Sequence, residues 1–241
     1  MNIAVCIKQV PDTASQLKIA EYNKTIEDNG IKYGINPFDE YALEEALRLK
    51  DKDNTINITV ISLGPERVKK ALTKTLAMGA DEAIHLQTDN SINDCMAIAN
   101  IITNEIKKKQ YDLILFGKKS VDQDNNQVGM IIGEINGIPC ISNCSEFAIE
   151  DNKIVANREV EGSVEVFEGE FPVIITHEKG KNELRYPSLK DLMAAKKKSI
   201  NTIDVDVNDN KNPELIRLEY PKKREEGIII GEDKSAVLEL I

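Results

Sequence analysis

Apolar runs and amphipathic stretches alternate along the first 145 residues, and this alternation predicts the fold class. Short, nearly continuous apolar runs predict buried strands, and they lie at 3–10, 56–63, 82–86, 112–116 and 138–141. Apolar positions spaced three and four apart predict helices between them, over 36–50, 65–78, 92–108 and 127–136. Such alternation is typical of a mostly parallel sheet with helices on both faces. We therefore predict a Rossmann-like α/β fold.

After residue 145 the pattern changes to short strands joined by turns. Three strands with antiparallel spacing are predicted at 147–149, 154–160 and 163–167, with turns at 151–152 and 161–162. One more apolar strand is predicted at 172–176. The α/β fold should therefore carry a small antiparallel extension.

The last fifty residues are poor in core-forming side chains. A basic helix is predicted over 188–199, an extended polar stretch over 200–231 and a short terminal helix over 232–241. Such a tail rarely folds by itself, so it either stays free or wraps a partner. The sequence thus predicts an α/β domain over 1–187, followed by a helix and a C-terminal arm over 188–241.

Charge and composition exclude several classes of protein. The net charge of −10 argues against nucleic acid as the main partner. No apolar run approaches the ~18–20 residues of a membrane span, and the N-terminus lacks the features of a signal peptide. The four cysteines are scattered and only two histidines exist, so no metal site is expected. Reduced, mostly buried cysteines indicate a cytoplasmic protein.

Motifs for catalysis are not found in the sequence. No Gly-x-Gly-x-x-Gly follows the first strand, and no Walker A motif occurs. There is no convincing Ser/His/Asp set, no paired-carboxylate motif and no His-x-x-x-His. We therefore assign no catalytic residue.

The strongest local signal for a ligand site is the polar loop from Gly117 to Gly129. It follows a buried strand and runs into a helix whose first N–H groups can hold a phosphate. Its Asp, Asn and Gln side chains can bind ribose hydroxyls or an adenine edge. Ligands of open parallel sheets bind beyond the carboxyl ends of strands, where Cys6, Asn36 and Leu63 are also expected. From this segment alone, a plain polar loop with a helix cap is the simpler interpretation.

The basic helix is the second signal. Ser188 and Asp191 fit a capping box, and Leu189, Leu192 and Met193 share one helix face. The apolar face could pack into the protein's own core and leave the lysines of 196–198 in solvent. Alternatively, it could insert into a pocket of a partner protein.

Taken together and in order, these segments resemble the beta subunit of electron transfer flavoproteins. The resemblance covers nearly the whole chain, and the matching segments are 5–12, 36–40, 43–46, 64–65, 76–81, 117–129 and 185–189, followed by Met193 and the lysines. Each segment alone is weak evidence for the family, but the order and spacing of all of them together make the match specific.

The resemblance implies a heterodimeric electron carrier. In this family an alpha subunit holds most of the redox-active FAD, and the beta subunit binds AMP in its own α/β domain. The implied AMP pocket consists of Cys6, Asn36, Pro37, Phe38, Asp39, Leu63, Gly117, Lys118, Lys119, Ser120, Val121, Asp122, Gln123, Asp124, Asn125, Asn126, Gln127 and Val128.

The resemblance also implies two protein partners. The family's recognition loop corresponds to about 177–199, with Leu189 as the anchor for an acyl-CoA dehydrogenase-type flavoenzyme. The C-terminal arm would wrap the alpha subunit, which accounts for its lack of core residues.

Two alternatives stay open at this point. Electron-bifurcating members oxidise NADH and bind a second FAD in place of AMP, and their loop usually reads Asp-Gly-Asp-Thr followed by Gln-Val-Gly-Pro. Here Gln123, Asn125 and Met130 replace the Gly, Thr and Pro. Because glycine permits close approach, Gln123 leaves less room for a flavin and favours AMP. The other alternative is a stand-alone nucleotide-binding sensor module.

Overall fold

The computed structural model describes residues 1–22, 24–89, 92–206, 215–224, 227 and 237. The chain divides into two compact units. The larger, which we call the α/β unit, comprises Met1–Gln16 and Asn29–Glu214, and the smaller comprises Leu17–Asp28 and Leu215–Ile241. In the smaller unit, the backbone N–H of Ile19 donates a 2.9 Å hydrogen bond to the Tyr220 hydroxyl.

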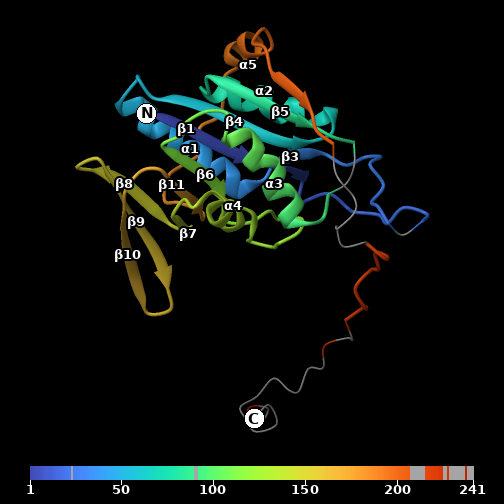
Figure 1. Ribbon diagram of the computed structural model, residues 1–241. Coiled ribbons are helices and arrows are strands. Elements are labelled where there is room, and N and C mark those ends of the chain that lie inside the picture. The colour runs from blue at the N-terminus through green and yellow to red at the C-terminus, as the bar shows by residue number, and fades with distance from the viewer. Residues whose placement is uncertain (23, 90–91, 207–214, 225–226, 228–236, 238–241) are drawn as a thin grey trace. The chain divides into compact units, whose positions relative to one another are not determined.

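A seven-stranded parallel sheet forms the centre of the α/β unit (Figure 1). Its strands follow the order β12-β5-β4-β1-β6-β11-β7, and each neighbouring pair runs parallel. Their bounds are β1 (Asn2–Ile7), β4 (Asn57–Gly64), β5 (Glu82–Gln87), β6 (Leu113–Gly117), β7 (Cys140–Cys144), β11 (Val173–His177) and β12 (Asn201–Asp204). The predicted α/β class is therefore confirmed.

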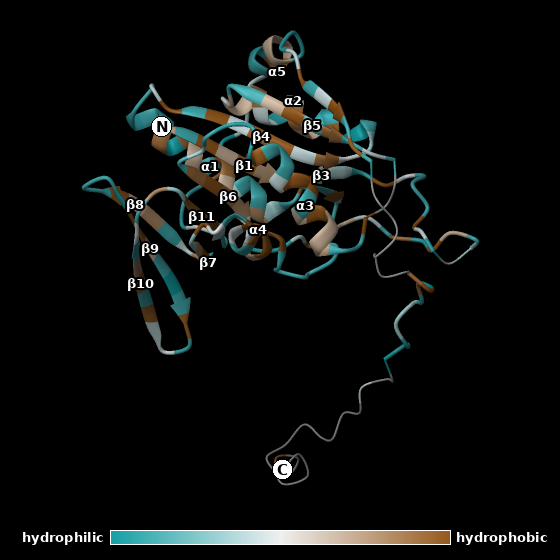
Figure 2. Ribbon diagram, viewed as in Figure 1, coloured by the Kyte–Doolittle hydropathy of each residue, from teal (hydrophilic) through white to brown (hydrophobic). Residues whose placement is uncertain are grey.

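Helices cover both faces of this sheet, and two separate apolar cores result. On one face lie α1 (Pro37–Lys52), the short η1 (Glu66–Val68) and α2 (Lys69–Met78); on the other lie α3 (Cys95–Ile106) and α4 (Val128–Asn136). Successive side chains of a strand point to opposite faces, so Ile3 packs with Leu43 of α1 while Ala4 packs with Ala99 of α3. Because both faces are buried, the central strands β1 and β6 are hydrophobic over almost their whole length, as the hydropathy colouring shows (Figure 2).

The predicted first strand over 3–10 is two strands in the structure. β1 ends at Ile7, and the separate strand β2 (Gln9–Pro11) pairs antiparallel with β3 (Tyr33–Ile35). The break falls at Lys8, whose N–H donates to the Asp39 carboxylate instead of to a neighbouring strand. A side-chain acceptor from a distant helix thus ends the strand.

The predicted antiparallel extension is a three-stranded sheet with the order β10-β9-β8. Its strands are β8 (Glu146–Glu150), β9 (Lys153–Val160) and β10 (Ser163–Gly169). The turn residues Asp151 and Asn152 adopt positive φ, a conformation that Asn and Asp tolerate better than other side chains. The turn predicted at these two residues is therefore confirmed.

The last part of the α/β unit is more ordered than its composition indicates. Helix α5 (Leu189–Ala195) is shorter than the predicted 188–199. The stretch predicted to be simply extended then supplies β12, which pairs with β5 at the edge of the main sheet. Residues 188–204 therefore belong to the α/β unit, while the division of roles between 1–187 and 188–241 stays a prediction. Apart from Val237, the predicted helix over 232–241 lies outside the described residues.

Candidate functional site

The carboxyl ends of β1, β4 and β6 lie side by side, because β1 is the central strand of the three. Cys6 of β1 is in register with Ile61 of β4 and with Phe116 of β6. The segments that follow these strands therefore meet at one edge of the sheet, together with the start of α1. This edge contains the predicted site residues of the first 128 positions, and we call it the carboxyl edge.

Asn36 holds two of these segments together. Its position precedes α1, but its side chain makes no capping hydrogen bond to the helix. Instead the fully buried amide donates to the carbonyl of Lys119 at 2.8 Å and accepts from the N–H of Val121 at 3.1 Å. Its own N–H donates to the carbonyl of Lys8 at 2.8 Å. The Asn36 side chain therefore does not cap α1, because the loop after β6 uses both of its polar atoms.

Asp39, in the first turn of α1, makes a second link between the same strands. Its Oδ2 accepts from the N–H of Lys8 at 2.7 Å, and its Oδ1 accepts from the N–H of Gly117 at 3.0 Å. Burial raises the pKa of this carboxyl to about 7, although hydrogen bonds from Lys8, Asn36 and Gly117 act in the opposite direction. Asp39 therefore joins the ends of β1 and β6 through their backbone.

Glycine is required at the two ends of the polar loop, at Gly117 in the last position of β6 and at Gly129 in the first turn of α4. A Cβ atom at Gly117 would lie 2.3 Å from Oδ1 of Asp39 and 2.7 Å from the carbonyl carbon of Phe38. A Cβ atom at Gly129 would lie 2.7 Å from Cγ2 of Thr176. All three distances are shorter than any stable contact, so these glycines allow α1 and α4 to pack against the strand ends.

Lys8 belongs to the carboxyl edge, although the sequence did not single it out as a site residue. Its Nζ donates to Oδ1 of Asp122 at 2.8 Å and to Oε1 of Gln123 at 2.9 Å. The only signal in the sequence is a lysine near the carboxyl end of the predicted strand over 3–10. An ion pair as accessible as the one with Asp122 contributes little to stability, but it fixes the position of the polar loop.

The polar loop is held in place by its own side chains. Gln123 donates to Oδ1 of Asn93 at 3.0 Å, Asn125 to Sγ of Cys95 at 3.2 Å, and Asn126 to Oδ1 of Asn143 at 3.0 Å. Asp124 and Asn126 adopt left-handed backbone conformations with φ of 58° and 51°. The loop is therefore shaped before any ligand arrives, which lowers the entropic cost of binding.

The loop leads into α4, whose first turn is available to an anion. Gln127 precedes the helix and its side chain makes no capping hydrogen bond. The N–H groups of the first turn have no carbonyl partners within the helix. Together with the helix dipole, such N–H groups can hold a phosphate or carboxylate group.

The remaining predicted residues lie around this edge in different environments. Cys6 is buried and burial raises the pKa of its thiol, which keeps the thiol neutral and unreactive. Nζ of Lys118 lies 5.2 Å from the ring centroid of Phe38 and also forms an ion pair with Glu178. Lys119 pairs with Asp124 at 2.6 Å. Leu63 and Ser120 are half-buried, while Pro37 is exposed.

Helix α5 presents an apolar surface to solvent. Leu189 is 77% exposed and Met193 is 55% exposed, while Leu192 is half-buried. The predicted capping box of Ser188 and Asp191 is confirmed. Since Leu189 and Met193 do not pack into the chain's own core, the helix has the arrangement that a docking surface requires.

Arg185 fixes the segment that leads into α5. Its guanidinium donates to both carboxylate oxygens of Glu44, at 2.9 and 3.1 Å, and to Oδ2 of Asp51 at 2.6 Å. These ion pairs lower the pKa of Asp51 and raise that of Arg185. Glu44 is buried, so this fork satisfies a carboxylate that water cannot reach.

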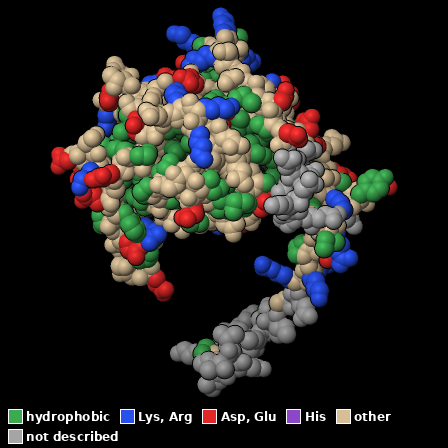
Figure 3. All heavy atoms as spheres, in the orientation of Figure 1, with side chains coloured by type: hydrophobic (Ala, Val, Ile, Leu, Met, Phe, Trp, Pro, Cys, Tyr) green, Lys and Arg blue, Asp and Glu red, His purple; other side chains and the backbone are tan. Residues whose placement is uncertain are grey.

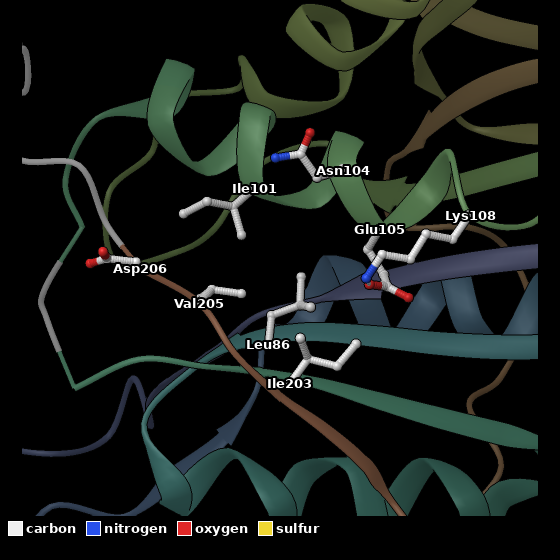
Figure 4. Close-up of a pocket in the computed structure, with 8 residues that line it drawn as sticks. All are labelled: Leu86, Ile101, Asn104, Glu105, Lys108, Ile203, Val205 and Asp206. Carbon is white, nitrogen blue, oxygen red and sulfur yellow. Dashed lines mark hydrogen bonds and ion pairs between the residues drawn. The ribbon is translucent and has the colours of Figure 1, made fainter.

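A separate hollow of about 180 Å³ lies between α3 and β12 (Figure 4). It contains none of the predicted site residues, and its lining residues are Leu86, Ile101, Asn104, Glu105, Lys108, Ile203, Val205 and Asp206. The Glu105 carboxylate and the Lys108 ammonium at its rim pair with each other at 2.7 Å. We assign it no ligand.

A family model described as "Electron transfer flavoprotein domain" matches residues 23–208 of the chain. The chain belongs to the electron transfer flavoprotein family. Three similar proteins are named electron transfer flavoprotein subunit beta. The one from Megasphaera elsdenii is 40% identical over 85% of this chain and 78% of its own length. The one from Bacillus subtilis is 36% identical, and the one from Homo sapiens 30%, each over 100% of this chain and 96% of its own length.

Family membership assigns the chain to the beta subunits, which are electron carriers. In the described part of the chain, no helix is long and apolar enough to cross a membrane. The same residues contain no group of three or more side chains that could hold a metal ion.

Proposed function

We propose that this chain is the AMP-binding subunit of a heterodimeric electron transfer flavoprotein. The observation that carries the proposal is the preformed polar loop at the carboxyl edge. Asn36 and Lys8 fix its position by hydrogen bonds, and it leads into the first turn of α4, which has no side-chain cap. Amide and carboxylate side chains next to free backbone N–H groups suit a ribose and a phosphate respectively.

AMP would be a structural ligand in this proposal. The phosphate would take the first turn of α4, and the nucleoside would lie among the segments after β1, β4 and β6. A ligand that binds only the folded chain stabilises it by mass action. No side chain of the carboxyl edge is needed as an acid, base or nucleophile.

The environment of Gln123 supports AMP rather than a second FAD. Its side chain is half-buried, and its amide lies between Nζ of Lys8 at 2.9 Å and Oδ1 of Asn93 at 3.0 Å. A glycine at this position would leave that space free for a larger ligand. With glutamine the loop is narrower, which suits a mononucleotide.

In this proposal, electron transfer depends on two partner proteins, an alpha subunit and a flavoenzyme. The flavin that carries electrons would be FAD held mainly by an alpha subunit, and the C-terminal arm would wrap that subunit. The exposed apolar face of α5 would dock an acyl-CoA dehydrogenase-type flavoenzyme, with Leu189 as its anchor. A cytoplasmic location also belongs to the proposal.

The test is the nucleotide content of the purified heterodimer. The complex is denatured, and the released nucleotides are separated by chromatography and counted per dimer. One FAD and one AMP per dimer would support the proposal. Two FAD and no AMP, with NADH-dependent flavin reduction, would instead indicate the electron-bifurcating form. A well-folded monomer that binds nucleotide without a partner would favour a stand-alone sensor module.

A matched pair of variants links the nucleotide to the carboxyl edge. Asn36→Ala removes both hydrogen bonds that hold the loop and should lower the AMP content while FAD stays bound. Asn100→Ala changes an exposed asparagine of α3 and should leave both contents unchanged. Retention of AMP at full occupancy in Asn36→Ala would contradict this location of the site.

A further inference from the structure

His85 is a buried histidine near the carboxyl end of β5. None of its surface is exposed, and no histidine side chain reaches the face of the molecule that Figure 3 shows. Its Nε2 lies 2.8 Å from the carbonyl oxygen of Gly64, the last residue of β4. A carbonyl oxygen can only accept a hydrogen bond, so Nε2 carries a proton and donates it.

The other ring nitrogen of His85 gains nothing from the fold. Nδ1 is buried and has no hydrogen-bond partner among the residues that the structure describes. A buried polar atom without a partner costs free energy, and an apolar side chain would avoid that cost. Ala83, the neighbour of His85 on the same face of β5, is such a residue. The hydrogen bond to Gly64 is therefore what distinguishes His85 from an apolar side chain in the same space.

Gly64 begins a tight turn from β4 into η1. Its φ is 149°, and a Cβ atom there would lie 2.9 Å from Cγ2 of Val68. Besides His85, the N–H of Thr88 donates to the Gly64 carbonyl at 3.2 Å. Two donors from the end of β5 thus hold the carbonyl at the start of this turn.

The same turn is fixed to the end of β1 on its other side. The Ser62 hydroxyl donates to the carbonyl of Ile7 at 2.8 Å. In η1 the carbonyl of Arg67 accepts from the side-chain amide of Gln9 at 3.0 Å, and the Arg67 guanidinium donates back to Gln9 at 2.7 Å. The backbone over 62–67, which includes Leu63, is therefore held by both neighbouring strands.

The order of the strands determines which part of a nucleotide this turn would meet. The polar loop and α4 follow β6, and β1 lies between β6 and β4. Neighbouring strands are about 4.8 Å apart, so the ends of β6 and β4 are separated by roughly 10 Å. A mononucleotide is comparable in length. With its phosphate at the first turn of α4, it would cross the end of β1 and bring its base to residues 63–64.

We propose that His85 is a positioning residue of the nucleotide site. By donating to the carbonyl of Gly64, it fixes Leu63 and Gly64 as the wall against which the base packs. This inference rests on the proposed function, which supplies the nucleotide. His85 does not touch the ligand in this proposal, because its ring is buried and acts through the backbone of Gly64.

Two amide substitutions at position 85 test the inference, because they imitate different ring nitrogens. His85→Gln places an N–H donor near the position of Nε2, whereas the shorter His85→Asn reaches only the position of Nδ1. The affinity of the heterodimer for AMP is measured by calorimetry after bound nucleotide has been removed. We expect His85→Asn to weaken AMP binding about tenfold and His85→Gln to restore most of that loss. Equal weakening in both variants, or none in His85→Asn, would overturn the inference.

A ligand without a base separates positioning of the wall from damage to the whole site. Ribose 5-phosphate contains the sugar and the phosphate of AMP, and its affinity is measured by competition with labelled AMP. His85→Asn should bind it as well as the wild type does, because the phosphate end lies on the other side of β1. An equal loss of affinity for both ligands would overturn the inference.

Thr103→Val is the control for a general loss of stability. It removes a buried hydrogen bond, from the Asn136 amide to the Thr103 hydroxyl at 3.2 Å. Thr103 lies in the last turn of α3, while the polar loop contacts the first residue of that helix, Cys95. The control should lower the melting temperature but leave the affinity for AMP unchanged. A loss of affinity as large as in His85→Asn would overturn the inference.

A third variant covers the case in which His85→Asn forms no heterodimer. His85→Met fills the space of the ring without a hydrogen-bond donor, and the same expectations and criteria then apply to it. The measurements also separate this inference from the proposed function. If the wild-type heterodimer neither contains nor binds AMP, the proposed function fails. If the wild type binds AMP and the variants without the donor bind it equally well, only the role of His85 is wrong.

Discussion

The N–H of Gly117, at the end of β6, donates a 3.0 Å hydrogen bond to Oδ1 of Asp39 in the first turn of α1. The other carboxylate oxygen of Asp39 accepts from the N–H of Lys8, directly after β1. One buried side chain thus sets the spacing between two adjacent strand ends and the helix that begins beside them.

Replacement of Gly117 tests how tightly this contact is packed. In Gly117→Ala the added methyl group would lie 2.3 Å from Asp39, so α1 must shift. Overpacking of this kind costs about 1–3 kcal/mol, and we expect a lower melting temperature together with loss of bound nucleotide. Gly34→Ala is the control, because a Cβ atom there meets nothing within 4 Å. Equal melting temperatures for the two variants would show that the edge is loosely packed.

Asp39 should make stability depend on pH. Burial raises its pKa from the ordinary 3.8 to about 7, so between these values the folded chain holds a proton that the unfolded chain has released. The stabilisation from Asp39 is therefore fully present below pH 3.8 and is lost as the pH rises through about 7, with a slope on the order of 1 kcal/mol per pH unit.

The Asp39→Asn variant isolates this effect, because asparagine does not titrate. The free energy of unfolding of the wild type, measured relative to the variant by urea titration, should fall between about pH 4 and pH 7 and then level off. A difference that stays constant with pH would show that Asp39 is ionised throughout this range.

Asn36→Ala should destabilise the chain as well as reduce nucleotide binding. It leaves the carbonyl of Lys119 and the N–H of Val121 without their present partner. An unpaired buried polar group costs about 1–3 kcal/mol, and thermal unfolding measures the loss. The exposed Asn100→Ala should shift the melting temperature by less than a quarter as much. Unchanged stability in Asn36→Ala would mean that water replaces the amide at no cost.

Arg185→Lys should alter the docking of the dehydrogenase without changing the flavin. Lysine cannot reproduce the fork that binds Glu44 and Asp51 together, so the segment before α5 should lose its fixed position. We expect a KM for the dehydrogenase several-fold higher and a flavin spectrum unchanged. Arg217→Lys, at an exposed pair with Glu219, is the control. A KM equal to that of the wild type would show that α5 is positioned by other contacts.

Leu189→Ala should slow electron transfer from the dehydrogenase at least tenfold. An exposed leucine that becomes buried in a partner's pocket contributes about 1.5–3 kcal/mol, and stopped-flow reduction of the flavin measures the loss. Met96→Ala removes an exposed apolar side chain of α3 and should have no effect. FAD and AMP contents should stay unchanged in both variants. Normal transfer rates in Leu189→Ala would exclude the docking role.

Local patterns predicted most elements, because each depends on neighbouring residues. The helix over 37–52, the strand over 57–64 and the capping box at Ser188 all follow from periodicity or short motifs. The polar loop is a candidate ligand site from the sequence alone, because many amide and carboxylate side chains follow a buried strand there. What it contacts could not be predicted, since Asn93, Cys95 and Asn143 are at distant positions in the chain.

The α/β class, the polar loop and the apolar positions of α5 follow from the amino-acid sequence, because periodicity and motif order are properties of the linear chain. The folded chain was needed to show that Asn36 holds the loop, that Lys8 lies at the carboxyl edge and that Asp39 joins two strands. It was also needed to show that residues 201–204 complete the main sheet and that His85 reaches the carbonyl of Gly64. These features depend on which strands are neighbours and on which face each side chain occupies, and packing across long separations in the sequence sets both.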